Sequence, residues 1–89
     1  MDGLEKLRQE INEIDKDLII LFQERMHKVK EIGNYKRKHQ LPILDSSREK
    51  EVLRRNLGYL TDKRLERDGE RFLIQLMEIS KEVQEREQG

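Results

Sequence analysis

The chain has 89 residues, of which 34% are apolar and 43% charged. A single domain spanning residues 1–89 fits this length, but so few apolar side chains predict a core that is marginal in a lone chain, so we expect a homo-oligomer. The absence of cysteine excludes disulfides and cysteine-based zinc sites, and the balance of 19 basic and 19 acidic side chains argues against nucleic acid or an anionic membrane as a partner.

A first helix is predicted from Leu4 to about residue 39, because this stretch has no proline and one glycine, Gly33. Pro42 cannot continue a helix and disfavours the α conformation at Leu41, so the helix should end just before it. Apolar side chains recur at helical spacing at Leu4, Leu7, Ile11, Ile14, Leu18, Leu21, Val29 and Ile32. The longest apolar run, 18–22, is too short to span a bilayer, and the N-terminus has no signal-peptide pattern. The sequence therefore predicts a cytoplasmic protein.

Two further helices are expected after Pro42. Asp45 and Ser46 offer N-cap oxygens, and Ser46 with Glu49 has the spacing of a capping box, so the second helix is placed at about 46–60. A third apolar face runs from residue 72 to about residue 87. No stretch alternates with a period of two, so the predicted fold class is all-α, with one very long helix and two shorter ones.

The length of the first helix predicts the architecture. About 36 residues at ~1.5 Å each make a rod of roughly 54 Å, whereas a compact chain of this size is only about 30 Å across. The rod also has two apolar seams, one with Leu7, Ile14, Leu18 and Ile32 and the other with Ile19, Phe22 and Met26. The two shorter helices cannot cover both seams, so we expect an intertwined homodimeric bundle in which two long helices pair.

Several polar residues fall on the apolar lanes of these helices. Arg25 lies within about 20° of Ile14, Leu18 and Ile32 at ~100° per residue. Lys36 lies about 20° from Arg25 on the same lane. On the other two helices, Glu49, Ser80 and Gln84 also lie among apolar positions. Such a cluster inside a bundle indicates either an ion-pair network or a pocket for a polar anion.

Each of these residues also has a purely structural interpretation. Arg25 and Lys36 could extend past the core to water, and Glu49 could serve only the capping box with Ser46. Ser80 could bond back to a carbonyl of the preceding turn, and Gln84 could be a buried structural amide. The basic run from Lys28 to Lys38 fits a solvated face better than a nucleic-acid patch, because aromatic residues do not interleave it. Two isolated histidines predict no metal site.

Taken together, these residues have a familiar order. The pattern comprises Leu7-Arg8-Gln9-Glu10-Ile11, Asp15, the run from Leu18 to Leu21, Glu24-Arg25, Gly33, Lys36, Pro42, Asp45, Arg48-Glu49, Ser80 and Gln84. It resembles the all-helical class of chorismate mutases over nearly the whole chain, and is least clear between Gly58 and Gly69. The resemblance implies an intertwined homodimer of three-helix chains that converts chorismate to prephenate, on the route to phenylalanine and tyrosine, without a cofactor or metal.

The resemblance also implies roles for eight residues. Arg25, Lys36, Arg48 and the partner's Arg8 would bind the anionic groups of the substrate. Asp45 and Glu49 would meet its hydroxyl side, Ser80 a carboxylate, and Gln84, with Lys36, the ether oxygen. The catalytic residues are then Lys36, Gln84, Glu49 and Arg25.

Helix geometry independently supports a site shared between chains. Arg8 and Arg25 are roughly 25 Å apart along the helix axis at ~1.5 Å per residue, so one chain cannot bring both to one small molecule. Antiparallel pairing of two long helices would bring them together. Two other functions remain open: an isochorismate pyruvate lyase of the same fold, or a non-catalytic helical module for dimerisation or regulation.

Overall fold

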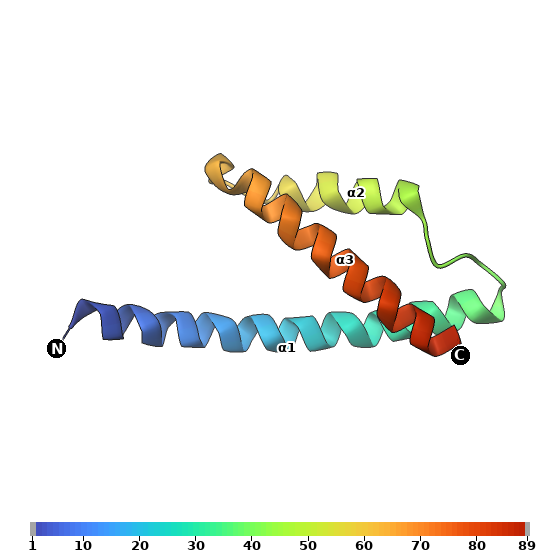
Figure 1. Cartoon of the computed structure of the whole chain (residues 1–89), viewed down its shortest axis with the longest axis horizontal. Coiled ribbons are helices and arrows are strands. Elements are labelled where there is room, and N and C mark those ends of the chain that lie inside the picture. The colour runs from blue at the N-terminus through green and yellow to red at the C-terminus, as the bar shows by residue number, and fades with distance from the viewer. Residues whose placement is uncertain (1, 89) are drawn as a thin grey trace.

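The computed structural model describes residues 2–88 and contains three α-helices in this range (Figure 1). In chain order the elements are α1 (Gly3–Lys38), α2 (Ser46–Leu57), the short 3₁₀ helix η1 (Lys63–Leu65) and α3 (Glu66–Gln88). This arrangement confirms the predicted all-α class. The principal extents are 57 × 26 × 15 Å, so the long helix overhangs the rest of the chain as predicted.

Helix α1 has clear start and stop signals. The Asp2 side chain accepts a hydrogen bond from the Glu5 amide at 2.8 Å and caps the first turn. Lys36, Arg37 and Lys38 occupy the last turn, where cations interact favourably with the helix dipole. Gln40 then takes a left-handed conformation with φ 55°, two residues before Pro42. The predicted end of the helix is confirmed.

The structure decides between the two N-cap residues that the sequence offered for α2. Asp45, not Ser46, is the N-cap, and its carboxylate accepts from the Arg48 amide at 3.1 Å. The proposed capping box between Ser46 and Glu49 is therefore wrong, and the Glu49 carboxylate is free to reach another helix. The helix ends at Leu57, three residues earlier than the predicted residue 60, with Gly58 as its C-cap.

Helix α3 begins well before its apolar face. Asp62 caps η1 by accepting from the Arg64 amide at 3.1 Å, and α3 follows directly from Glu66. Gly69 lies inside α3, where an added Cβ would stand 3.0 Å from Leu60 Cδ1. A glycine here lets the end of α2 pack closely on the start of α3.

The core lies where α3 crosses the C-terminal half of α1 (Figure 1). Its buried apolar side chains are Met26 and Val29 from α1 and Leu73, Met77 and Val83 from α3. The two helices approach most closely at Gly33, where a Cβ would meet Gln84 Cα at 3.2 Å. This close crossing fixes the position of Gln84 relative to α1.

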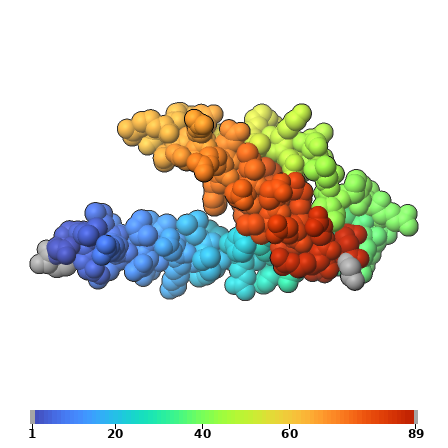
Figure 2. All heavy atoms as spheres, viewed as in Figure 1, coloured from blue at the N-terminus to red at the C-terminus, as the bar shows by residue number. Residues whose placement is uncertain are grey.

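The N-terminal half of α1 is uncovered by its own chain. Figure 2 shows an open wedge between this rod and the start of α3. The apolar side chains along the rod are 46–65% exposed at Leu4, Leu7, Ile11, Ile14, Leu18, Ile19, Ile20 and Leu21. Their spacing includes the alternation of three and four residues that is typical of a seam between paired helices. Within residues 2–88, no helix combines the length and apolarity needed to cross a membrane.

Candidate active site

A cavity of about 220 Å³ opens between the three helices. Its apolar walls come from Val29 and Ile32 on α1, Val52 on α2 and Met77 on α3. Seven of the eight predicted site residues line it: Arg25, Lys36, Asp45, Arg48, Glu49, Ser80 and Gln84. The structure therefore brings together side chains that are up to 59 positions apart in the sequence (84 − 25).

Arg25 is partly buried and donates a hydrogen bond to Ser80 Oγ. The Ser80 hydroxyl in turn donates to the Leu76 carbonyl at 2.8 Å. The back-bonding that the sequence left open as an alternative is therefore present, and the hydroxyl oxygen can still accept from Arg25. Burial, and secondarily the positive charge of Arg48, lower the pKa of the Arg25 guanidinium below its ordinary value. The guanidinium nevertheless stays charged in water at any physiological pH.

Lys36 reaches the loop between α1 and α2. Its ammonium donates to the Ile43 carbonyl at 2.8 Å. Because an ammonium has three protons, this bond leaves donors for a ligand in the cavity. No carboxylate within residues 2–88 lies within ion-pair distance of Lys36 or Arg25. Two cations that line the cavity thus lack a negative partner, which favours the anion pocket over the ion-pair network.

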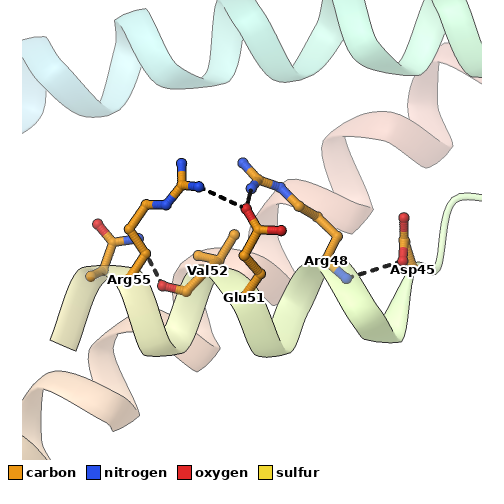
Figure 3. Close-up of polar contacts among 6 residues, drawn as sticks. Asp45, Arg48, Glu51, Val52 and Arg55 are labelled. Atoms are coloured by element: carbon orange, nitrogen blue, oxygen red, sulfur yellow. Dashed lines mark hydrogen bonds and ion pairs between the residues drawn. The ribbon is translucent and has the colours of Figure 1, made fainter. Parts of the chain in front are cut away.

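Arg48 is oriented by its neighbours on α2. Its guanidinium pairs with Glu51 Oε1 at 2.8 Å, and Arg55 pairs with the same oxygen at 3.0 Å. Figure 3 shows the two guanidinium groups meeting at Glu51 on the side of α2 that faces α1. Asp45 contributes at the first turn, where its carboxylate caps the Arg48 amide.

Glu49 pairs with a residue that the sequence analysis did not select. Lys81 Nζ lies 3.2 Å from Glu49 Oε2 and 2.8 Å from Glu78 Oε1. Hydrogen bonds to Glu78, which has the larger effect, and to Glu49 raise the pKa of Lys81 above its ordinary value. Lys81 follows Met77 by four residues and precedes Gln84 by three, so its place on the buried lane of α3 was the available signal.

Gln84 is buried, with 8% of its surface exposed. Its Oε1 atom has no hydrogen-bond partner among the side chains and backbone of residues 2–88. A buried amide with an unmet oxygen costs free energy, so the simple structural interpretation of Gln84 is disfavoured. The side chain lines the cavity with polar groups that a ligand or water can satisfy.

Arg8 is the predicted site residue that one chain does not bring to the cavity. It lies on the exposed N-terminal half of α1 and is absent from the cavity lining. This position agrees with the helix arithmetic, which separates Arg8 and Arg25 by roughly 25 Å at ~1.5 Å per residue.

The side chains that line the cavity carry more positive than negative formal charge. Four cations line it, Arg25, Lys36, Arg48 and Lys81, against the two carboxylates of Asp45 and Glu49. The formal excess of two positive charges suits a small dianion. Arginine can bind carboxylates with two parallel hydrogen bonds, and the apolar walls lower the local dielectric, which strengthens every charge–charge contact. No group of three potential metal-ligating side chains occurs in the described part of the chain.

Comparison with known proteins gives this cavity a family context. The chain is 43% identical over 49 residues to the T-protein of Haemophilus influenzae, and this alignment covers 55% of this chain and 13% of that protein. It is 40% identical over 57 residues to the bifunctional chorismate mutase/prephenate dehydratase of Aquifex aeolicus, and this alignment covers 64% of this chain and 16% of that protein. The chain thus spans less than a fifth of the length of these relatives. No solved structure matches it significantly.

A family model gives the broadest match. The model described as chorismate mutase type II matches residues 7–85, a range that includes α2, η1, nearly all of α1 and most of α3. This range contains all eight residues selected from the sequence and the less clear stretch between Gly58 and Gly69. A three-helix chain with this cavity and this match belongs to the chorismate mutase type II family, the all-helical class.

Proposed function

We propose that this chain is a chorismate mutase domain, an isomerase that rearranges chorismate to prephenate in phenylalanine and tyrosine biosynthesis. The observation that carries the proposal is the unpaired positive charge at Arg25. This guanidinium is partly buried, lies near enough to Arg48 for its pKa to fall, and has no carboxylate partner within residues 2–88. Chorismate is a dicarboxylate, so its binding would supply the missing negative charge.

The chemistry requires little beyond binding and electrostatics. In this Claisen-type rearrangement the ether C–O bond breaks as a C–C bond forms within one molecule, so no nucleophile or proton transfer is needed. A catalyst lowers the barrier by holding the substrate in a compact chair and by stabilising negative charge that develops on the ether oxygen. Apolar walls with a few fixed donors suit both tasks.

Each of the seven predicted site residues that line the cavity has a role in this proposal. Arg25 and Arg48 bind the carboxylates, and Ser80 accepts from Arg25 and holds its guanidinium in place. Lys36 and the Gln84 side-chain NH2 group donate to the ether oxygen. The Gln84 Oε1 atom, which lacks a partner within residues 2–88, is left to accept from a water or from another donor of the ligand. Glu49 accepts from the substrate hydroxyl, and Asp45, four residues earlier at the start of α2, lines the same cavity.

The proposed active assembly is a homodimer. Next to the polar cavity lies an apolar groove of about 410 Å³, lined by Leu18, Ile19, Leu21, Phe22, Arg25, Phe72, Gln75, Leu76 and Ile79. Soluble monomers rarely expose continuous apolar surface of this kind. A second copy of α1, running antiparallel, would cover the groove with its own apolar seam and bring the partner's Arg8 toward Arg25, the residue shared by the groove and the cavity.

Product analysis tests the proposed activity. Purified protein is added to chorismate, the loss of its ultraviolet absorbance is followed, and prephenate is identified. Isochorismate in a parallel reaction covers the lyase alternative, which would release salicylate and pyruvate. Chorismate that stays unchanged at every protein concentration would support the non-catalytic module. A cytoplasmic location, with neither nucleic acid nor a membrane as partner, completes the proposal.

A further inference from the structure

Lys81 connects two of the helices that form the cavity. Its ammonium lies between Glu49 on α2, at 3.2 Å, and Glu78 one turn earlier on α3, at 2.8 Å. Within residues 2–88 this is the one ion pair that joins side chains of two different helices. The Lys81 and Glu49 side chains are 23% and 30% exposed, so water screens the pair less than it screens the surface pairs of α2.

The geometry leaves one oxygen of Glu49 available. Lys81 contacts Oε2, and no other side chain of the described residues donates to this carboxylate. An ionised carboxylate can accept at both oxygens, so Oε1 can accept a hydrogen bond from a hydroxyl of a ligand in the cavity. Because Asp45, and not Ser46, caps α2, Glu49 has no capping task that would turn it away from the cavity.

Charge gives Lys81 a second effect on the same residue. A dianion entering the cavity meets the Glu49 carboxylate, and like charges at short range oppose binding. The neighbouring ammonium offsets that repulsion. Glu78, which is 55% exposed, holds the ammonium from the outer side, so the order Glu78–Lys81–Glu49 leads from solvent to the cavity wall.

We propose that Lys81 is a positioning residue for the rearrangement: it binds Oε2 of Glu49 and thereby directs Oε1 of Glu49 toward the substrate hydroxyl. This inference rests on the proposed chorismate mutase activity. Lys81 itself touches neither carboxylate nor ether oxygen of the substrate in this arrangement, and it acts through Glu49. Loss of Lys81 should therefore matter only while Glu49 is present as a carboxylate.

A double-mutant cycle tests this dependence. The variants are Lys81→Met, Glu49→Gln and the two combined, with kcat and KM measured for each on chorismate. Lys81→Met should lower kcat/KM about tenfold in the wild-type background and less than about twofold in the Glu49→Gln background. Lys81→Arg, which keeps a donor and the charge, should recover most of the loss. Lys81→Gln serves as a second variant that tolerates exposure to water should Lys81→Met fold poorly.

The matched control is Lys50→Met. Lys50 is an exposed lysine on α2, next to Glu49 in sequence but outside the cavity lining, and its loss removes the same charge. It should leave kcat/KM within about twofold of the wild-type value. Glu78→Gln should give an intermediate loss, because Lys81 keeps Glu49 as a partner.

The outcomes separate the two proposals. Equal losses from Lys81→Met in both backgrounds, in an active wild-type enzyme, would remove the positioning role and leave the proposed function intact. An equal loss from Lys50→Met would do the same by assigning the effect to net charge. A folded wild-type protein that leaves chorismate unchanged would remove the proposed function and, with it, this role for Lys81.

Discussion

The two halves of α1 have similar apolar periodicity but different surroundings. In the C-terminal half, α3 covers the helix and leaves Met26 and Val29 only 6% exposed. In the N-terminal half, Leu7, Ile14 and Leu18 are 51–58% exposed along one seam. The difference shows that periodicity identifies which face of a helix is apolar, while the identity of the covering element depends on chain length and topology.

Arg25 stands at the boundary between these halves. It lines the polar cavity on one side and the apolar groove on the other. Whatever covers the exposed half of α1 therefore also forms a wall next to the site. In the proposed dimer, the covered half of α1 forms part of its own chain's site, and the exposed half contributes Arg8 to the partner's site. The following experiments test these two roles.

The largest effect is expected from a charge in the exposed seam. Leu18→Glu places a carboxylate in the surface that the partner helix would bury, and burying an unpaired charge costs several kcal/mol. We expect the dimer to dissociate and prephenate formation to fall at least about a hundredfold, as measured by sedimentation velocity and by product assay. Lys16→Glu, on the same helix and exposed, is the control and should change neither. An unchanged mass for Leu18→Glu would rule out this face as the interface.

A strong effect is also expected from complementation between the two halves. Arg8→Ala and Arg25→Ala homodimers should each lose nearly all activity, because each lacks one cation of every site. Unfolding and refolding an equal mixture should form mixed dimers that hold one intact site. Random pairing then restores about a quarter of the wild-type activity, since half the dimers are mixed and half of their sites are intact. No recovery in verified mixed dimers would remove Arg8 from the partner's site.

A moderate effect is expected where α3 covers α1. Gly33→Ala adds a Cβ at 3.2 Å from Gln84 Cα and 3.3 Å from Glu87 Cβ, so the helices must shift by a few tenths of an ångström. Overpacking of this kind costs about 1–3 kcal/mol, and displacement of Gln84 should lower kcat about tenfold. Thermal unfolding and steady-state kinetics measure both effects. Gly3→Ala, which meets no atom within 4 Å, should retain full activity.

The smallest effect is expected from pH. Gln84 does not titrate, and Arg25 stays charged despite its lowered pKa, so activity should change less than about twofold between about pH 6 and 8. The raised pKa of Lys81 means that its ion pair stabilises the fold below the ordinary lysine value of about 10.4 and is lost only as the pH rises past the raised value. A steep loss between about pH 6 and 8 would contradict Gln84 as the donor to the ether oxygen.

The fold was largely predictable because its signals are local. Pro42 and the apolar repeat predicted the end of α1, and the helical spacing of apolar residues, with no stretch that alternates with a period of two, predicted an all-helical chain. The end of α2 was placed three residues late, because the apolar pattern continues to Leu60 while the helix stops at Leu57. Leu60 instead packs on Gly69 of α3, a tertiary contact that periodicity does not encode.

The site was predictable where a polar residue interrupts an apolar lane. Arg25, Ser80 and Gln84 were selected in this way, and all three line the cavity. The capping role assigned to Glu49 was wrong because Asp45, one residue before Ser46, reaches the Arg48 amide instead. Lys81 was missed because lysine is common in a chain that is 43% charged, and its pairing with Glu49 depends on how α2 and α3 pack.

The hydrogen bond from Lys36 to the Ile43 carbonyl has a consequence for thermal motion. That bond and the N-cap formed by Asp45 hold the loop between α1 and α2 at two neighbouring points. Lys36 and Asp45, which make these contacts, also line the cavity. Ligand binding and loop rigidity therefore share the same atoms. A substitution at Lys36 that makes this loop more rigid would also change ligand binding in the cavity, so thermal stability and ligand affinity cannot be altered separately at this position.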